Sequence, residues 1–159
     1  VNKEPAAKLL IIGEGPYKLE VEKEISENKA ENYVEFLGSL PASDVAKYHN
    51  YADIFILPSL ANKTGTEALG LALMEAMSSG CAVIGTNVGG IPSLIKNGYN
   101  GILVPQKDSK ELAGAIIAFL KNRKKAEIMG QNASNFIRRN YSWDKIGKEF
   151  IDIYKSIIK

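Results

Sequence analysis

One stretch of the chain, TEALGLALMEAMSSG at Thr66 to Gly80, constrains the possible folds more than any other. A fully apolar run, Ile54 to Pro58, precedes it across a short polar loop. Within the stretch, apolar residues fill most of the space between two carboxylates, Glu67 and Glu75. An apolar run, a polar loop, an apolar-rich segment and a final glycine are typical of a buried strand followed by a helix. We therefore expect a helix that begins near Gly70.

The two carboxylates allow two interpretations. Their separation of eight residues is just over two helical turns, so Glu67 would lie in the loop and Glu75 inside the helix. Helix N-termini bind phosphate through free N–H groups and the macrodipole, and carboxylates accept hydrogen bonds from hydroxyl groups. The pair could hold a ligand that carries hydroxyl groups next to phosphates. Alternatively, Glu67 only favours the helix dipole and Glu75 is a solvated acid.

Composition limits the class of protein. The chain has 159 residues with 45% hydrophobic content, which suits one domain with an ample core. Its net charge of +2, from 20 basic and 18 acidic side chains, does not mark a nucleic-acid or membrane-surface binder. The basic residues gather late in the chain, at Lys121, Arg123, Lys124, Lys125, Arg138 and Arg139. No run approaches the ~20 apolar residues of a membrane helix, and the N-terminus VNKEPAAK does not resemble a signal peptide.

Two residue types that often carry chemistry occur once each. Cys81 excludes an internal disulfide, fits a reducing compartment and is expected to be a small buried residue rather than a nucleophile. His49 has no second metal ligand nearby and is expected to be structural. No Asp-x-Asp motif occurs, and the acids lack ligand spacing, so the sequence predicts no metal site.

Strand and helix patterns alternate along the chain. The predicted strands are Leu9 to Gly13, Tyr33 to Gly38, Ile54 to Pro58, Cys81 to Thr86 and Gly101 to Pro105. The predicted helices are Tyr17 to about Asn28, Pro41 to about Ala52, one from about Gly70, a short one at Ser93 to Ile95, and three later ones carrying Leu112 to Leu120, Ile128 to Ile137 and Ser142 to about Ile158. Because the first strand has four consecutive large aliphatic residues, we expect it to be buried on both faces.

This alternation predicts an α/β fold with a doubly wound, Rossmann-like parallel sheet and helices on both faces. Ligands of such folds bind outside the carboxyl ends of the strands. Glycine-rich loops follow four of the strands, at Gly13 and Gly15, Gly38, Gly65 and Gly70, and Gly89 and Gly90. The architecture therefore favours a nucleotide-like ligand, although the turn at Gly13 to Pro16 could equally be a plain tight turn.

A series of ordered motifs resembles a known family. They are GEGP, VEFLG, ADIFILPS, EALGLALMEAMSSG, GGIP, NGYNGILVP and YSWDKI. Together they cover about Leu9 to Tyr154 and resemble the C-terminal domain of the family-four retaining glycosyltransferases of GT-B fold. The resemblance implies one nucleotide-sugar-binding domain over residues 1–159. It also implies a hexose-type sugar moved from a nucleoside-diphosphate sugar to a glycan or lipid-linked acceptor, as in polysaccharide biosynthesis.

The resemblance also assigns roles to residues. Glu67 would be the catalytic acid near the donor sugar, and Glu75 would bind the ribose hydroxyls. The remaining donor contacts it implies are a diphosphate cradle at Leu69, Gly70 and Leu71, a wall for the base at Leu37, Gly38 and Leu40, and cleft-lining turns at Gly13, Gly15, Gly89 and Gly90. No cofactor is implied beyond the donor itself, a UDP-, GDP- or ADP-sugar. Nothing in the sequence chooses the base, the sugar, the acceptor, the linkage or the oligomeric state.

The sequence departs from the family pattern at Ala68, Cys81 and Ser93, where the family usually has Gly, Pro and an acid. The family's upstream segment, with an Arg and a Lys that neutralise the diphosphate, and its N-terminal acceptor domain have no counterpart in these residues. We therefore expect a fragment that binds donor weakly and does not turn over. The full-length enzyme is expected in the cytoplasm, peripheral at the inner membrane face. Its last helix would lose a partner from the acceptor domain or else pack on its own sheet.

Two other function classes stay open. One is a sugar-nucleotide epimerase of the same fold, against which the two-glutamate block and the short GGIP loop argue. The other is a non-catalytic nucleotide-binding or interaction module. A Rossmann dehydrogenase is not favoured, because GEGP lacks the third glycine and no acid ends a second strand.

Overall fold

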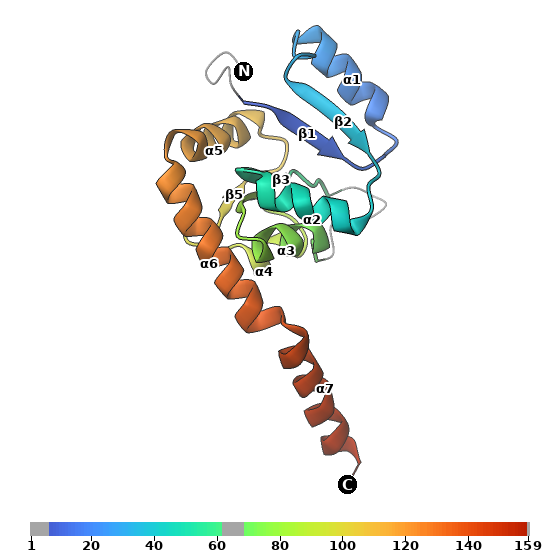
Figure 1. Cartoon of the computed structure of the whole chain (residues 1–159), viewed down its shortest axis with the longest axis vertical. Coiled ribbons are helices and arrows are strands. Elements are labelled where there is room, and N and C mark those ends of the chain that lie inside the picture. The colour runs from blue at the N-terminus through green and yellow to red at the C-terminus, as the bar shows by residue number, and fades with distance from the viewer. Residues whose placement is uncertain (1–6, 62–68, 159) are drawn as a thin grey trace. The chain divides into compact units, whose positions relative to one another are not determined.

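The computed structural model describes residues 7–61 and 69–158, which form an α/β chain with parallel strands (Figure 1). The chain divides into two compact units, Val1–Tyr48 and His49–Lys159, and each is described by itself. The single domain expected over residues 1–159 stays a prediction.

The first unit is built on a pair of parallel strands. Strand β1 (Leu9–Ile12) is followed by helix α1 (Lys18–Glu27) and strand β2 (Val34–Gly38), with Leu9 opposite Val34 in the ladder. Helix α2 (Ala42–Tyr51) begins in this unit. The expectation that the first strand is buried on both faces is wrong, since Leu9 is 46% and Leu10 43% exposed. Within the described residues β1 pairs only with β2, and α1 buries none of its side chains.

The second unit contains a three-stranded parallel sheet in the order β3-β4-β5. Its strands are β3 (Ile54–Leu57), β4 (Ala82–Thr86) and β5 (Ile102–Val104). Every residue of the central strand β4 is buried, because it has a neighbour on each edge and helices on each face.

Successive residues of β4 feed two different cores, as the alternation of a strand requires. Val83 packs on one face with residues of α3 (Leu71–Ser78), α4 (Ile91–Leu94) and the later half of α6 (Arg123–Tyr141). Ile84 packs on the other face with α5 (Ser109–Lys121) and the beginning of α6. Helices therefore cover both faces of this sheet, which confirms the predicted class of fold.

Helix α6 approaches the backbone that leads from α3 into β4. The Ser134 hydroxyl donates to the carbonyl of Ser78 at 3.0 Å. A Cβ atom built at Gly130 would lie only 2.0 Å from the carbonyl oxygen of Gly80. Only glycine allows this close approach of helix and turn.

The last helix, α7 (Trp143–Ile157), buries none of its residues. It follows α6 after the single extended residue Ser142, whose hydroxyl accepts from the N–H of Lys145 at 3.4 Å (Figure 1). Its exposed apolar side chains include Trp143, Phe150, Ile151, Ile153, Tyr154 and Ile157. The structure thus gives no support to the alternative in which this helix packs on its own sheet.

Candidate functional site

The start of α3 is the most distinctive backbone feature of the second unit. Gly70 adopts φ 74° and ψ 56°, the left-handed region, and precedes the first helical residue, Leu71. It is buried, and a Cβ atom there would lie 3.5 Å from Leu57 Cδ2 and 3.4 Å from Leu73 Cβ. The glycine lets the chain turn sharply at the carboxyl end of β3 and enter the helix.

The N–H groups of the first turn of α3 lack intrahelical partners, as at every helix start. The N-cap residue, Gly70, has no side chain to cap this turn, and the turn contains no acidic residue. Leu69 and Leu71 are 41% and 67% exposed, so solvent reaches the segment around Gly70. The structure therefore places the three predicted cradle residues at a solvent-accessible helix start, at the positive end of the helix dipole.

Glu75 lies on α3, about one turn after Leu71, and its side chain is exposed. Its backbone carbonyl accepts the hydroxyls of Ser78 and Ser79 at 2.9 and 3.1 Å. The other predicted acid, Glu67, lies outside the described residues, as does Ala68. The structure thus places Glu75 on the helix whose start forms the predicted cradle.

Side chains tie together the loops at the carboxyl ends of β3, β4 and β5. The hydroxyl of Thr86, which ends β4, donates to the carbonyl of Ser59 at 2.6 Å. The side chain of Gln106, which follows β5, accepts from the N–H of Ala61 at 2.7 Å. The same amide donates to the carbonyl of Asn87 at 3.5 Å. The edge at which α3 begins is therefore cross-linked by side chains.

The loop after β4 carries the predicted pair Gly89 and Gly90 to the start of α4. Gly89 is exposed with φ 55°, and Gly90 immediately precedes Ile91. The hydroxyl of Ser93 donates to the carbonyl of Gly90 at 2.6 Å. At this departure from the family pattern, the side chain serves the local turn.

In the first unit, the predicted glycines meet at the carboxyl edge of the two-stranded sheet. The N–H of Gly13 donates to the carbonyl of Gly38 at 2.8 Å, and both residues have positive φ, 119° and 65°. Gly15 lies in the exposed turn before α1. Leu37 and Leu40 are half-buried on either side of Gly38. The binding roles of these five residues stay predictions.

The charge of Glu75 acts on the only histidine. His49 is 6% exposed and packs edge-to-face on Phe55, with 5.3 Å between ring centroids. Burial lowers the pKa of His49, and the nearby Glu75 carboxylate opposes that shift. The packing fits the structural role predicted for this residue.

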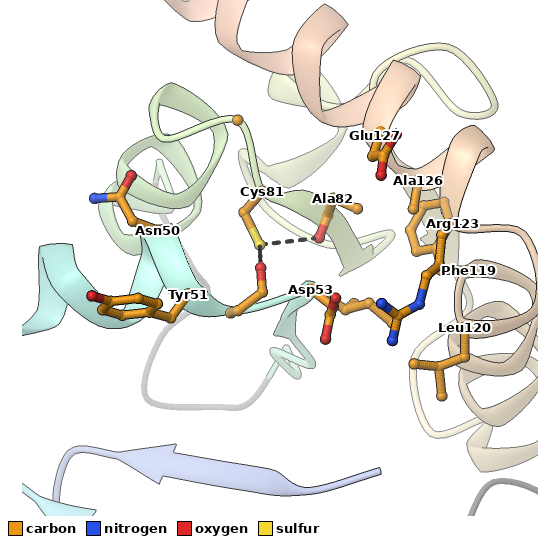
Figure 2. Close-up of a pocket in the computed structure, with 13 residues that line it drawn as sticks. Asn50, Tyr51, Asp53, Cys81, Ala82, Phe119, Leu120, Arg123, Ala126 and Glu127 are labelled. Atoms are coloured by element: carbon orange, nitrogen blue, oxygen red, sulfur yellow. Dashed lines mark hydrogen bonds between the residues drawn. The ribbon is translucent and has the colours of Figure 1, made fainter. Parts of the chain in front are cut away.

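The opposite edge of the same sheet, at the amino ends of the strands, holds a hollow of about 240 Å³ (Figure 2). Asp53 and Cys81, which precede β3 and β4, line it together with Arg123 and Glu127 of α6. Burial raises the pKa of the Cys81 thiol to about 11, and the thiol lies 3.4 Å from the carbonyl oxygen of Ala52. Cys81 is thus a small buried side chain, as predicted, and its raised pKa disfavours the nucleophilic thiolate. Because this hollow lies at the amino ends of the strands, it is separate from the edge at which α3 begins.

Sequence reasoning missed Thr86 and Gln106. The only signal was their position, since each is a polar residue at the carboxyl end of an apolar strand. Among the described residues no group of three His, Cys, Asp or Glu side chains is arranged to hold a metal ion. Nor does the described part of the chain contain a helix of the length and apolarity that crossing a membrane requires.

Parallel strands with helices on both faces define an α/β protein, and folds of this class bind their ligands outside the carboxyl ends of the strands. The family described as "Glycosyl transferases group 1" matches residues 1–136. The chain therefore belongs to the group 1 glycosyltransferases, and its fold is that of the C-terminal half of a GT-B enzyme.

Relatives agree with this assignment over most of the chain. An uncharacterised glycosyltransferase of Methanocaldococcus jannaschii is 32% identical over 149 residues, which are 94% of this chain and 37% of the relative. The N-acetyl-alpha-D-glucosaminyl L-malate synthase of Bacillus anthracis is 33% identical, over 96% of this chain and 38% of the relative. The chain thus spans less than two fifths of the length of either relative.

A solved structure gives the same picture. Anabaena HepE in complex with UDP-glucose superimposes with a TM-score of 0.83 at 25% identity. The match covers 96% of this chain and 42% of HepE. The matched residues therefore include both units of the chain. HepE itself holds a nucleotide sugar in that structure.

Proposed function

We propose that this chain is the donor-binding half of a retaining glycosyltransferase. It would take a hexose-type sugar from a nucleoside-diphosphate sugar and pass it to a glycan or lipid-linked acceptor. The observation that carries the proposal is the left-handed Gly70, which opens the start of α3 at the carboxyl edge of the sheet while Glu75 stands on the same helix.

The start of α3 would bind the donor diphosphate. Its first-turn N–H groups and helix dipole suit an anion, and no acidic side chain in that turn competes for them. The nucleoside diphosphate is also the leaving group in glycosyl transfer, and its β-phosphate takes up the negative charge. N–H groups that already point at the departing phosphate stabilise the negative charge that develops on it in the transition state. They lower the activation barrier because they need not reorient during the reaction. The same N–H groups would therefore serve both binding and catalysis.

Glu75 would accept hydrogen bonds from the two ribose hydroxyls. A carboxylate has enough lone pairs to accept both, and charge-assisted bonds are about twice as strong as neutral ones. Its exposed position about one turn into α3 leaves it open to a ligand held at the helix start. Glu67, outside the described residues, would stand near the donor sugar. Gly89 and Gly90 would approach the donor through their backbone.

Relatives and neighbours support a nucleotide-sugar donor without choosing its base. HepE is described with UDP, and a relative from Mycobacterium tuberculosis, 27% identical over 94% of this chain, is named a GDP-mannose-dependent phosphatidylinositol monomannoside mannosyltransferase. HepE thus binds a uridine nucleotide. The name of the mycobacterial relative specifies a guanosine nucleotide sugar as donor and a lipid as acceptor. Both fit the proposed reaction class.

Separate titrations with UDP, GDP and ADP, followed by backbone amide NMR shifts, test the donor site. We expect one nucleotide to shift the amides of Gly70, Leu71 and Gly89. Glu75→Ala should weaken that binding by about tenfold or more, because it removes charge-assisted hydrogen bonds. Glu127→Ala, which makes the same change at the opposite edge of the sheet, is the matched control and should bind as the unchanged chain does.

Binding that is indifferent to Glu75→Ala, or shifts confined to residues away from α3, would contradict the proposed site. A turnover assay on the full-length enzyme separates the function classes, because the donor-binding half alone is not expected to turn over. A transferase releases nucleoside diphosphate only when an acceptor is present, an epimerase converts the donor without one, and a binding module does neither.

A further inference from the structure

Helix α6 has a larger net positive charge than the whole chain. Its five basic side chains and single acid, Glu127, give it a net charge of +4. The whole chain has a net charge of only +2, so the remaining residues together carry −2. The modest total therefore conceals one strongly basic element.

The packing of α6 determines where these charges point. The helix buries a stripe of small and apolar residues, Ala126, Met129, Gly130, Ala133, Ser134 and Ile137. Its cations lie off this stripe and are exposed. We use the name basic face for the exposed residues Lys124, Lys125, Ile128, Arg138 and Arg139.

Apolar surface accompanies the charges at the beginning of the helix. Lys124, Lys125 and Ile128 line a hollow of about 370 Å³ together with Tyr99 from the turn before β5. Ile128 is 54% and Tyr99 55% exposed. The side chain of Asn132 donates to the carbonyl of Tyr99 at 3.0 Å and so holds this turn against α6. The apolar side chain of Ile128 and the phenol ring of Tyr99 thus lie in the same hollow as the two lysines.

Helix stability does not explain the charges in the first turn. Arg123, Lys124 and Lys125 stand at the positive end of the helix dipole, where cations are unfavourable and acids are preferred. None of the ion pairs found among the described residues involves a cation of α6. The arrangement leaves a strongly anion-attracting surface.

The spacing of the charges indicates an extended anionic partner. Arg138 follows Lys124 by fourteen positions, which corresponds to about 21 Å along a helix. One small phosphate cannot bridge that distance. A sheet of anionic headgroups can meet both ends of the face at once.

We propose that the basic face of α6 docks on an anionic phospholipid surface. Clusters of four or more Lys and Arg side chains on a helix attract anionic lipids, and Tyr prefers the level of the headgroups. A nucleic-acid strand is less well matched, because the face offers one phenol rather than a series of aromatic rings for stacking. The docking goes beyond donor binding, since Lys124 and Lys125 line a hollow beside the turn before β5, whereas α3 begins at the carboxyl edge of the sheet.

Co-sedimentation with vesicles tests this docking. The chain is mixed with vesicles of phosphatidylcholine alone and with vesicles that also contain phosphatidylglycerol, at low and at physiological salt. We expect binding only to the anionic vesicles, decreasing with salt because exposed charges are screened. Lys124→Gln/Lys125→Gln should lower the vesicle partition coefficient by about 20-fold. Lys110→Gln/Lys148→Gln makes the same change of net charge on α5 and α7 and should lower it by less than about threefold.

Equal binding to both kinds of vesicle would overturn the proposal and point to the exposed apolar side chains of α7 as the contact. Absence of binding to both, or full binding by Lys124→Gln/Lys125→Gln, would overturn it as well. A parallel assay with single-stranded DNA covers the nucleic-acid alternative, which is favoured if the same two lysines are needed there and vesicles are not bound. In every case the nucleotide titration of Lys124→Gln/Lys125→Gln reports separately on the donor site.

Discussion

The side chain of Gln106 accepts a hydrogen bond from the backbone N–H of Ala61, 45 positions away in the sequence, at 2.7 Å. Its amide group also reaches the carbonyl of Asn87 at 3.5 Å. One side chain after β5 therefore holds the loops that follow β3 and β4. Because α3 and α4 continue from these loops, Gln106 supports the edge at which donor binding is proposed.

Gln106→Ala should loosen this edge. Loss of one hydrogen bond of about 1 kcal/mol predicts an increase of about fivefold in the hydrogen-exchange rate of the Ala61 amide. Gln106→Glu keeps an acceptor for Ala61 but loses the donor to Asn87, so the Ala61 amide should stay protected. Gln131→Ala, on the surface of α6, is the control. Unchanged exchange at Ala61 in Gln106→Ala would show that the loop is held by other groups.

Gly130→Ala should destabilise the second unit strongly. Its new methyl group would lie 2.0 Å from the carbonyl oxygen of Gly80, so α6 must move away from the turn before β4. Overpacking of this kind costs about 1–3 kcal/mol, and a clash with backbone belongs at the upper end. Urea unfolding followed by circular dichroism measures the loss. The control is Gly114→Ala on α5, where nothing lies within 4 Å of the added methyl group. It should stabilise by up to about 1 kcal/mol.

The stability of the second unit should fall when the pH drops below the usual pKa of histidine. Burial lowers the pKa of His49 in the folded chain, so the unfolded chain takes up the proton first. Stability therefore rises with pH through the window below about 6.5 and is lost on acidification. His49→Phe should remove this part of the pH dependence, as unfolding measured at several pH values would show.

Glu75→Gln should lower the pKa of His49 further, because the carboxylate favours the protonated ring. His49 is the only histidine, so one imidazole signal in the NMR spectrum reports the titration without assignment by mutation. An unchanged or raised midpoint in Glu75→Gln would mean that the two groups do not interact in solution.

The Cys81 thiol should produce the opposite pH dependence. Burial raises its pKa from about 9 to about 11, so the folded chain keeps a proton that the unfolded chain loses. The thiol's contribution to the free energy of unfolding is fully present below about pH 9. That contribution decreases by about 2–3 kcal/mol as the pH rises toward 11. Subtracting the pH profile of Cys81→Ala isolates this contribution from those of Tyr and Lys. A thiol reagent should also leave the folded chain unmodified at neutral pH.

Short apolar runs predicted the strands of the second unit well. The structure has β3 at Ile54–Leu57 and β4 at Ala82–Thr86, each within one residue of the expected range. The helix after Gly70 also begins where expected, because Gly70 is both a helix boundary and a left-handed turn. Such local signals were strong enough to establish the parallel α/β class.

Burial and long-range contacts could not be derived in the same way. Four aliphatic residues predicted a fully buried first strand, but burial depends on which layers surround a strand, and Leu9 and Leu10 are nearly half exposed. The hydrogen bond between Gln106 and Ala61 joins two polar loops whose composition gives no sign of pairing. The division into a two-stranded and a three-stranded sheet likewise depends on strand neighbours, which no local pattern specifies.

Helix α7 has a consequence for how sequences of this family can be compared. None of its residues is buried, and one extended residue, Ser142, joins it to α6. Its aromatic and aliphatic side chains therefore contribute nothing to the core of the second unit. The folding of the second unit therefore does not require apolar residues at these positions of α7. If homologous chains keep them apolar, that retention records a contact that α7 makes with another surface.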